Sequence, residues 1–171
     1  GCDPQKLEDR LRDDTDSKIK AICIVHNETS TGSASRVGQV RAAIDAAGHD
    51  GLFFVDTISS LASMDYRHDD WRVDVTVAGS QKGLMLPPGL SFNAVSEKAL
   101  LASRASGMRR SYWDWEEQIA ANADGAFPYT PATNLLYGLS EAITMLHEEG
   151  LDAVFQRHDR HAAATRRAVQ A

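Results

Sequence analysis

The feature that most constrains the fold is a series of short apolar runs that end in polar residues. The runs occupy residues 19–25, 52–55, 73–79 and 90–95. Their length and β-branched content are typical of buried strands. Between the first two runs, residues 35–47 carry apolar side chains at helical spacing and end at Gly48. Strand, helix and strand in this order predict an α/β fold with a mostly parallel sheet and helices on both faces.

Helical patterns account for most of the remaining chain. Asp3 and Pro4 are expected to cap a helix over residues 5–12, and Ser96 is expected to cap another that extends to about residue 106. Further helices are predicted at residues 112–121, at 132–148 and from 151 onward. The last third of the chain is therefore mostly helical.

Composition excludes several classes of protein. The formal charge of −6 in 171 residues argues against nucleic acid and anionic membranes as partners. No apolar run reaches the roughly 18 residues of a membrane span, and no signal peptide is visible, so we expect a cytoplasmic protein and leave a peroxisomal or mitochondrial one open. The histidines and the two cysteines lack metal-ligand spacing, and Cys23 is expected to be buried in its strand.

Polar residues follow three of the apolar runs. They are the loop at 26–32, Asp56 with Thr57, and the segment 79–82. Ligand-binding groups of parallel sheets gather where the strands end, at the carboxyl edge. We therefore expect these three segments to lie together and to form the functional site.

Each candidate has a functional and a structural interpretation. Lys82 is placed to form an imine, although most lysines are exposed and inert. Asp56 could hold a cofactor nitrogen or cap the following turn. Thr29 could contact a cofactor, or its loop could cap the helix that begins near Ser35. Ile58 could pack on a ring or simply fill space.

Four ordered segments resemble class V aminotransferases of pyridoxal-phosphate (PLP) fold type I, and within them the serine–glyoxylate and alanine–glyoxylate group. They are residues 26–32 (HNETSTG), 55–60 (VDTISS), 79–89 (GSQKGLMLPPG) and 129–131 (YTP). The resemblance covers essentially the whole chain. It implies part of the large domain, incomplete at both ends, because the family's phosphate loop and its substrate-binding arginine have no counterpart here.

The resemblance assigns a role to each matching residue. Lys82 would form the Schiff base with PLP and move the substrate proton, and Asp56 would pair with the pyridine nitrogen. Thr29 would contact the cofactor near its phenolic oxygen. Ile58 would pack on the ring, and Gln81 would help to hold the phosphate.

The resemblance also implies a homodimer, because Thr130 matches a residue that reaches the phosphate of the neighbouring subunit's cofactor. The family's tyrosine three positions earlier is Phe127 here, which removes one phosphate hydrogen bond. Residues 1–131 would be the cofactor-binding segment, and residues 132–171 would lead toward a small C-terminal domain.

The activity implied is amino transfer from serine or alanine to glyoxylate, with small amino acids and 2-oxo acids as partners. Cysteine desulfurases share the fold, but they carry a histidine before the lysine and a later nucleophilic cysteine. Here Gln81 precedes Lys82, and no cysteine follows Cys23. A noncatalytic fragment that serves as a scaffold is the other alternative.

Overall fold

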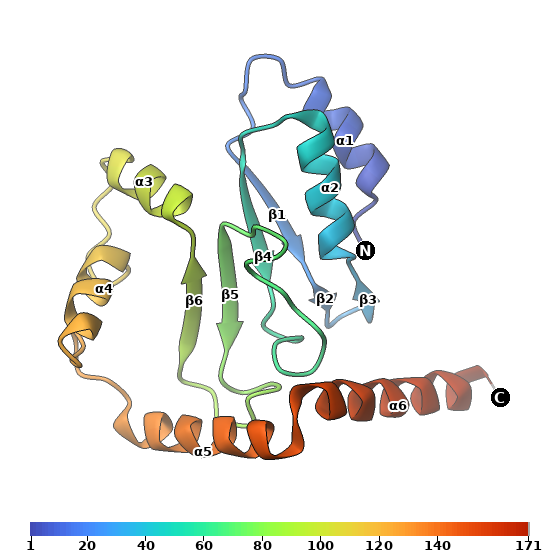
Figure 1. Ribbon diagram of the computed structural model, residues 1–171, viewed down its shortest axis with the longest axis vertical. Coiled ribbons are helices and arrows are strands. Elements are labelled where there is room, and N and C mark those ends of the chain that lie inside the picture. The colour runs from blue at the N-terminus through green and yellow to red at the C-terminus, as the bar shows by residue number, and fades with distance from the viewer. Residues whose placement is uncertain (171) are drawn as a thin grey trace.

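A four-stranded sheet forms the centre of the computed structural model, which describes residues 1–170 (Figure 1). The strand order is β1-β4-β5-β6. The first three strands are parallel, and β6 runs antiparallel to β5 at one edge. The strands are β1 (Ala21–Val25), β4 (Leu52–Asp56), β5 (Val75–Gly79) and β6 (Ser91–Val95). The predicted α/β class with a mostly parallel sheet is confirmed.

The loop after β1 contains a small ribbon that the sequence pattern did not predict. Its two strands, β2 (Asn27–Glu28) and β3 (Ser33–Ala34), pair antiparallel. Each strand is only two residues long, too short for an alternating pattern to reveal it. The ribbon turns the chain back from the end of β1 toward the next helix.

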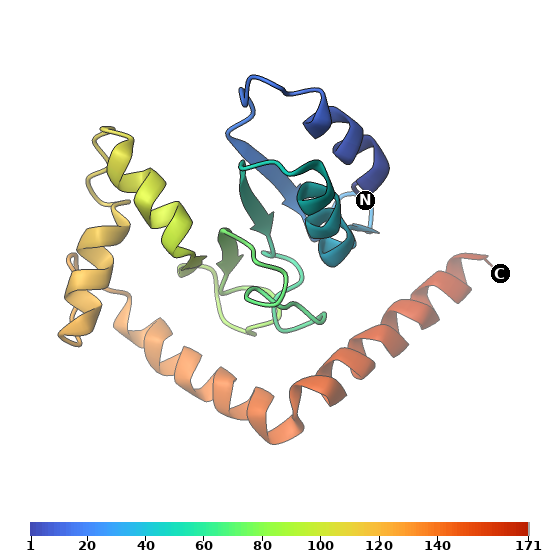
Figure 2. The ribbon, with the colours of Figure 1, turned by 45° about the horizontal axis from the view of Figure 1, so that its top comes forward.

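Two helices lie on one side of the sheet, α1 (Pro4–Arg12) and α2 (Val37–Ala47), and Figure 2 shows them next to each other, to the right of β1. Phe53 and Val55 of β4 point to this face and are fully buried against Val40 and Ile44 of α2. Residues that alternate along a strand face opposite sides of its sheet. The main core therefore lies between β4 and α2.

The opposite face of the sheet is only partly covered. Cys23 of β1 points there and is exposed, its β4 neighbour Phe54 is half-buried, and Asn93 of β6 is exposed. The prediction of a buried Cys23 is wrong, because strand alternation puts this side chain on the face away from α2. An apolar run alone does not tell which of its alternating positions are covered.

The helix ends follow the local signals. Asp3 accepts hydrogen bonds from the backbone N–H groups of Gln5 and Lys6 at the start of α1. Gly48 ends α2 in the left-handed conformation, with φ of 63°. Ser96 accepts a hydrogen bond from the N–H of Ala99 at the start of α3. All three caps were predicted from the sequence.

Four helices follow β6 in the chain and lie around the sheet: α3 (Glu97–Ala105), α4 (Trp115–Ala123), α5 (Thr133–Glu149) and α6 (Leu151–Gln170). Figure 1 shows α5 and α6 passing beneath the ends of β4 and β5. There Leu146 of α5 and Val154 of α6 pack with Leu84, which follows β5. Within residues 1–170, no helix combines the length and the apolar character needed to cross a membrane.

Candidate functional site

Three polar loops leave the same edge of the sheet. Val25 pairs with Asp56, and Asp56 pairs with Val77, so β1, β4 and β5 end nearly level. Beyond the ends of the strands, the N–H of His26 donates to the carbonyl of Asp56 at 2.9 Å, and the N–H of Thr57 donates to that of Val77 at 2.8 Å. The prediction that these segments share one edge is confirmed.

Gly79 presents no side chain at this edge. It lies two residues after Val77 and so faces the same side of the sheet as Asp56. A Cβ at Gly79 would lie 3.0 Å from Gln81 Oε1 and 3.7 Å from a methyl carbon of Ile58. Glycine at position 79 therefore leaves room for the amide of Gln81 beside Ile58.

Ser59 joins the loop after β1 to the turn after β4. Its hydroxyl donates to the carbonyl of Asn27 at 3.0 Å and lies 2.8 Å from Thr29 Oγ1. Thr29 is thus held beside the turn that begins at Asp56. The alternative that its loop caps the next helix is not observed, since Arg36 precedes α2 without a side-chain cap.

Asp56 is half-buried at the end of β4. Its Oδ1 accepts the N–H of Ile58 at 2.8 Å. One of the two carboxylate oxygens therefore caps the following turn. Asp56 forms no ion pair with any residue in the range 1–170. One oxygen fixes the orientation of the carboxylate, and the other remains free to accept a proton donor from a ligand.

The loop that carries Lys82 is closed by Ser80, whose side chain is fully buried. The Ser80 hydroxyl donates to the carbonyl of Pro87 at 2.8 Å and accepts the N–H of Leu90 at 3.2 Å. The N–H of Leu86 donates to the Ser80 carbonyl at 3.1 Å. Lys82 lies within this closed loop, is exposed, and forms no ion pair with the residues that the structure describes.

Gly83 presses the Lys82 loop onto the turn after β4. A Cβ at Gly83 would lie only 2.1 Å from the carbonyl oxygen of Leu61 and 2.6 Å from Ser63 Oγ. Glycine is required because the two backbones approach too closely for any side chain. The contact ties the position of Lys82 to the turn that bears Asp56 and Ile58.

Thr130 is not part of this group. It is exposed, in the connection between α4 and α5, and it forms no hydrogen bond with the five other candidates among the described residues. Its neighbour Tyr129 is bound locally, because the phenol oxygen accepts the N–H of Tyr112 at 3.1 Å. The structure therefore brings together Thr29, Asp56, Ile58, Gln81 and Lys82, and leaves Thr130 apart.

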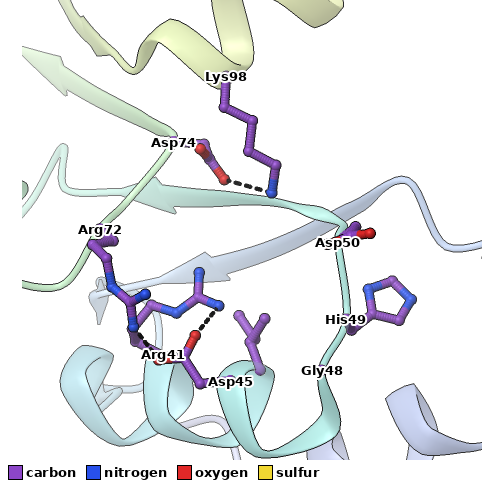
Figure 3. Close-up of a pocket in the computed structure, with 9 residues that line it drawn as sticks. Arg41, Asp45, Gly48, His49, Asp50, Arg72, Asp74 and Lys98 are labelled. Carbon is purple, nitrogen blue, oxygen red and sulfur yellow. Dashed lines mark hydrogen bonds and ion pairs between the residues drawn. The ribbon is translucent and has the colours of Figure 1, made fainter.

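A cavity of about 650 Å³ opens at the opposite, amino-terminal edge of the sheet (Figure 3). Most of its charges are paired within the chain. Arg41 and Arg72 both contact Asp45, and Lys98 lies 3.6 Å from Asp74. A ligand would have to displace these ion pairs, so the carboxyl-terminal edge with its free amine and carboxylate is the better candidate site.

The serines that organise this edge were not assigned roles from the sequence. Ser59 holds Thr29, Ser60 lies 2.9 Å from His26 Nδ1, and Ser80 closes the Lys82 loop. The only signal was their place directly after apolar runs. That position does not name a partner.

Comparison with known proteins places the chain in a family. The model of the class-V aminotransferases matches residues 2–171. Serine–glyoxylate aminotransferases of Methylorubrum extorquens and Hyphomicrobium methylovorum are 52% and 48% identical over the whole chain, which spans 44% and 43% of their lengths. An alanine–glyoxylate aminotransferase structure from Nostoc sp. matches with a TM-score of 0.84 and 28% identity, over 95% of this chain and 43% of that one. The chain belongs to the class-V aminotransferase family.

Proposed function

We propose that the full-length protein is a PLP-dependent aminotransferase that moves an amino group from serine or alanine to glyoxylate. The observation that carries the proposal is that one sheet edge bears both an amine without an ion pair and a carboxylate of fixed orientation. Lys82 supplies the amine and Asp56 the carboxylate. Gly79, which carries no side chain, leaves room for Gln81 beside Ile58 at the same edge.

The residues at this edge have the chemistry that PLP requires. Asp56 would keep the pyridine nitrogen protonated with its free oxygen, and Ile58 would support one face of the ring. Thr29, held by Ser59, would contact the cofactor near its phenolic oxygen, and the amide of Gln81 would contact the phosphate. When bound, PLP supplies an electron-accepting ring that stabilises negative charge on the substrate α-carbon.

Lys82 would perform two tasks in this mechanism. Its amine would hold the cofactor covalently until an amino acid displaces it, and the released amine would then take the proton from the substrate α-carbon. Because Ser80 and Gly83 fix both sides of Lys82, the amine would stay near the reacting carbon after release. The proton would return through the same amine.

The relatives support serine as the leading amino donor. Both curated relatives named above are serine–glyoxylate aminotransferases, whereas the solved structure is an alanine–glyoxylate enzyme of lower identity. Because the chain spans less than half of the length of these relatives, donor, acceptor and activity belong to the proposal. The same holds for the division into a cofactor-binding segment, 1–131, and a helical segment, 132–171.

A homodimer is also proposed, with Thr130 directed to the partner's cofactor. Exposed aromatic side chains surround this connection: Trp113 is 76% exposed, Tyr112 is 59% exposed, and Tyr129 is 40% exposed. Such an aromatic surface is typical of a protein interface. Thr130 lies apart from the other five candidates, which supports a role toward a second subunit.

The proposal is tested by the absorbance spectrum of the full-length protein with PLP. We expect an imine band near the visible edge that serine bleaches and glyoxylate restores. Lys82→Ala should abolish the band and lower the transamination rate at least about 100-fold. Lys6→Ala, an exposed lysine of α1, is the control. A wild-type protein without the band, or a band that survives in Lys82→Ala, would refute the assignment.

A further inference from the structure

Behind the candidate site, a buried histidine connects two of its loops. His26 follows β1 and is only 5% exposed. Its Nδ1 lies 2.9 Å from the hydroxyl of Ser60, a residue 34 positions away with no exposed surface. The two side chains therefore form a buried hydrogen bond between the Thr29 loop and the turn after β4.

His26 faces away from the side of the sheet that carries Asp56. Val25 pairs with Asp56 and shares its face of the sheet, so the next residue, His26, points to the face covered by α2. Its ring lies among aromatic side chains, with the ring centroids of Tyr66 at 5.5 Å and Trp71 at 6.4 Å. A ligand on the Asp56 side would not contact this imidazole.

The surroundings favour the neutral form of the imidazole. Burial lowers the pKa of His26 below its ordinary value, and the nearby Asp65 opposes this shift only in part. Tyr66 is tied to the sheet through its hydroxyl, 2.6 Å from Thr76 Oγ1. His26 is thus held as a hydrogen-bonding group among buried side chains.

Two contacts from His26 reach the turn that carries Asp56 and Ile58. Its N–H donates to the carbonyl of Asp56 at 2.9 Å, and its ring holds Ser60. The N–H of Ser60 donates in turn to the carbonyl of Thr57 at 3.0 Å. Asp56 and Ile58 therefore lie on a segment that is fixed at both ends by the same residue.

We propose that His26 is a positioning residue, which acts through Ser60 to hold Asp56 and Ile58 in place for the cofactor. This inference rests on the proposed function. It assigns no direct contact with PLP or substrate to His26. Its effect would come from the geometry of the turn, so loss of the hydrogen bond should weaken cofactor binding more than substrate binding.

The test compares two substitutions in the full-length holoenzyme. His26→Leu removes the hydrogen bond and keeps much of the volume, whereas His26→Asn places an amide group near the position of Nδ1. We expect His26→Leu to raise the dissociation constant of PLP about 10-fold and to lower kcat, with KM for serine changed less than about 2-fold. His26→Asn should restore PLP affinity to within about 3-fold of the wild type.

His49 provides the matched control. Its side chain is buried and hydrogen-bonded to Asp14 at 3.1 Å, but it lies at the opposite edge of the sheet. His49→Leu should lower the melting temperature without changing PLP affinity. If His26→Leu does not fold, Ser60→Ala removes the same hydrogen bond with a smaller change in volume and should raise the dissociation constant in the same direction.

The outcomes separate the inference from the proposed function. A wild-type enzyme that binds PLP and transaminates, with unchanged PLP affinity in His26→Leu and Ser60→Ala, overturns the positioning role alone. Equal losses of PLP affinity in the His26 and His49 variants, in parallel with their melting temperatures, also overturn it. A wild-type protein that binds no PLP refutes the proposed function, and the inference falls with it.

Discussion

Replacing Gly83 by alanine is expected to destabilise the protein and to displace the Lys82 loop. The added Cβ would lie 2.1 Å from the carbonyl oxygen of Leu61. Carbon and oxygen atoms in close contact normally stay about 3.3 Å apart, so one backbone segment must move by about 1 Å. Leu61 cannot yield easily, because its own N–H is bonded to the carbonyl of Thr57 at 2.9 Å.

The size of the destabilisation depends on which atom the added Cβ would contact. Overpacking typically costs about 1–3 kcal/mol, and here no rotamer change relieves the clash, since the neighbouring atom belongs to the backbone. We expect a loss of about 2 kcal/mol in the free energy of unfolding. With a urea m-value of about 2 kcal/mol per M, the unfolding midpoint should fall by about 1 M.

Urea unfolding of the full-length protein, followed by circular dichroism, measures this change. Gly138→Ala in α5 is the control, because its Cβ would meet only the flexible end of Leu86, at 2.7 Å. Alanine also favours a helix over glycine by up to about 1 kcal/mol, so the control should stay within about 1 kcal/mol of the wild type. A Gly83→Ala midpoint within about 0.2 M of the wild type would refute the close backbone contact.

Two further predictions concern hydrogen bonds at the ends of the sheet. The N–H of Ile19 donates to Asp14 at 2.7 Å and is the largest cause that lowers the pKa of Asp14 from 3.8 to about 2. Ionised Asp14 therefore stabilises the fold at neutral pH, and this contribution should disappear as the pH falls from about 4 through about 2. Urea midpoints measured across this range should differ between wild type and Asp14→Asn at pH 6 and converge near pH 2; a constant difference would contradict the assignment. Ser80→Ala should lower the free energy of unfolding by about 2 kcal/mol, because the carbonyl of Pro87 and the N–H of Leu90 each lose a hydrogen-bond partner. An unfolding free energy within about 0.5 kcal/mol of the wild type would show that these bonds contribute little.

The sequence by itself determined the strands, most helices and the caps. These features depend on residues within a few positions of one another, such as Asp3 with the first turn of α1 or Gly48 at the end of α2. It also indicated the edge where the site would form. Polar residues after successive buried strands must meet if the strands are parallel, and the register of β1, β4 and β5 confirms that they do.

Other features were decided only by the tertiary structure. An apolar run carries no sign of its direction in the sheet, so the antiparallel pairing of β6 came from the structure. The exposure of Cys23 depends on which face α2 covers. Both depend on contacts between segments that are far apart in the chain, and local periodicity does not encode them.

The same distinction holds for the candidate site. The sequence named Lys82 and Asp56, because their positions after apolar runs are local signals. It did not reveal that Gly83 rests on Leu61 or that His26 is bonded to Ser60. These contacts exist because parallel strands bring their following loops together, at separations along the chain that no sequence pattern spans. The chemistry of the site could be predicted locally, whereas its geometry is set by packing.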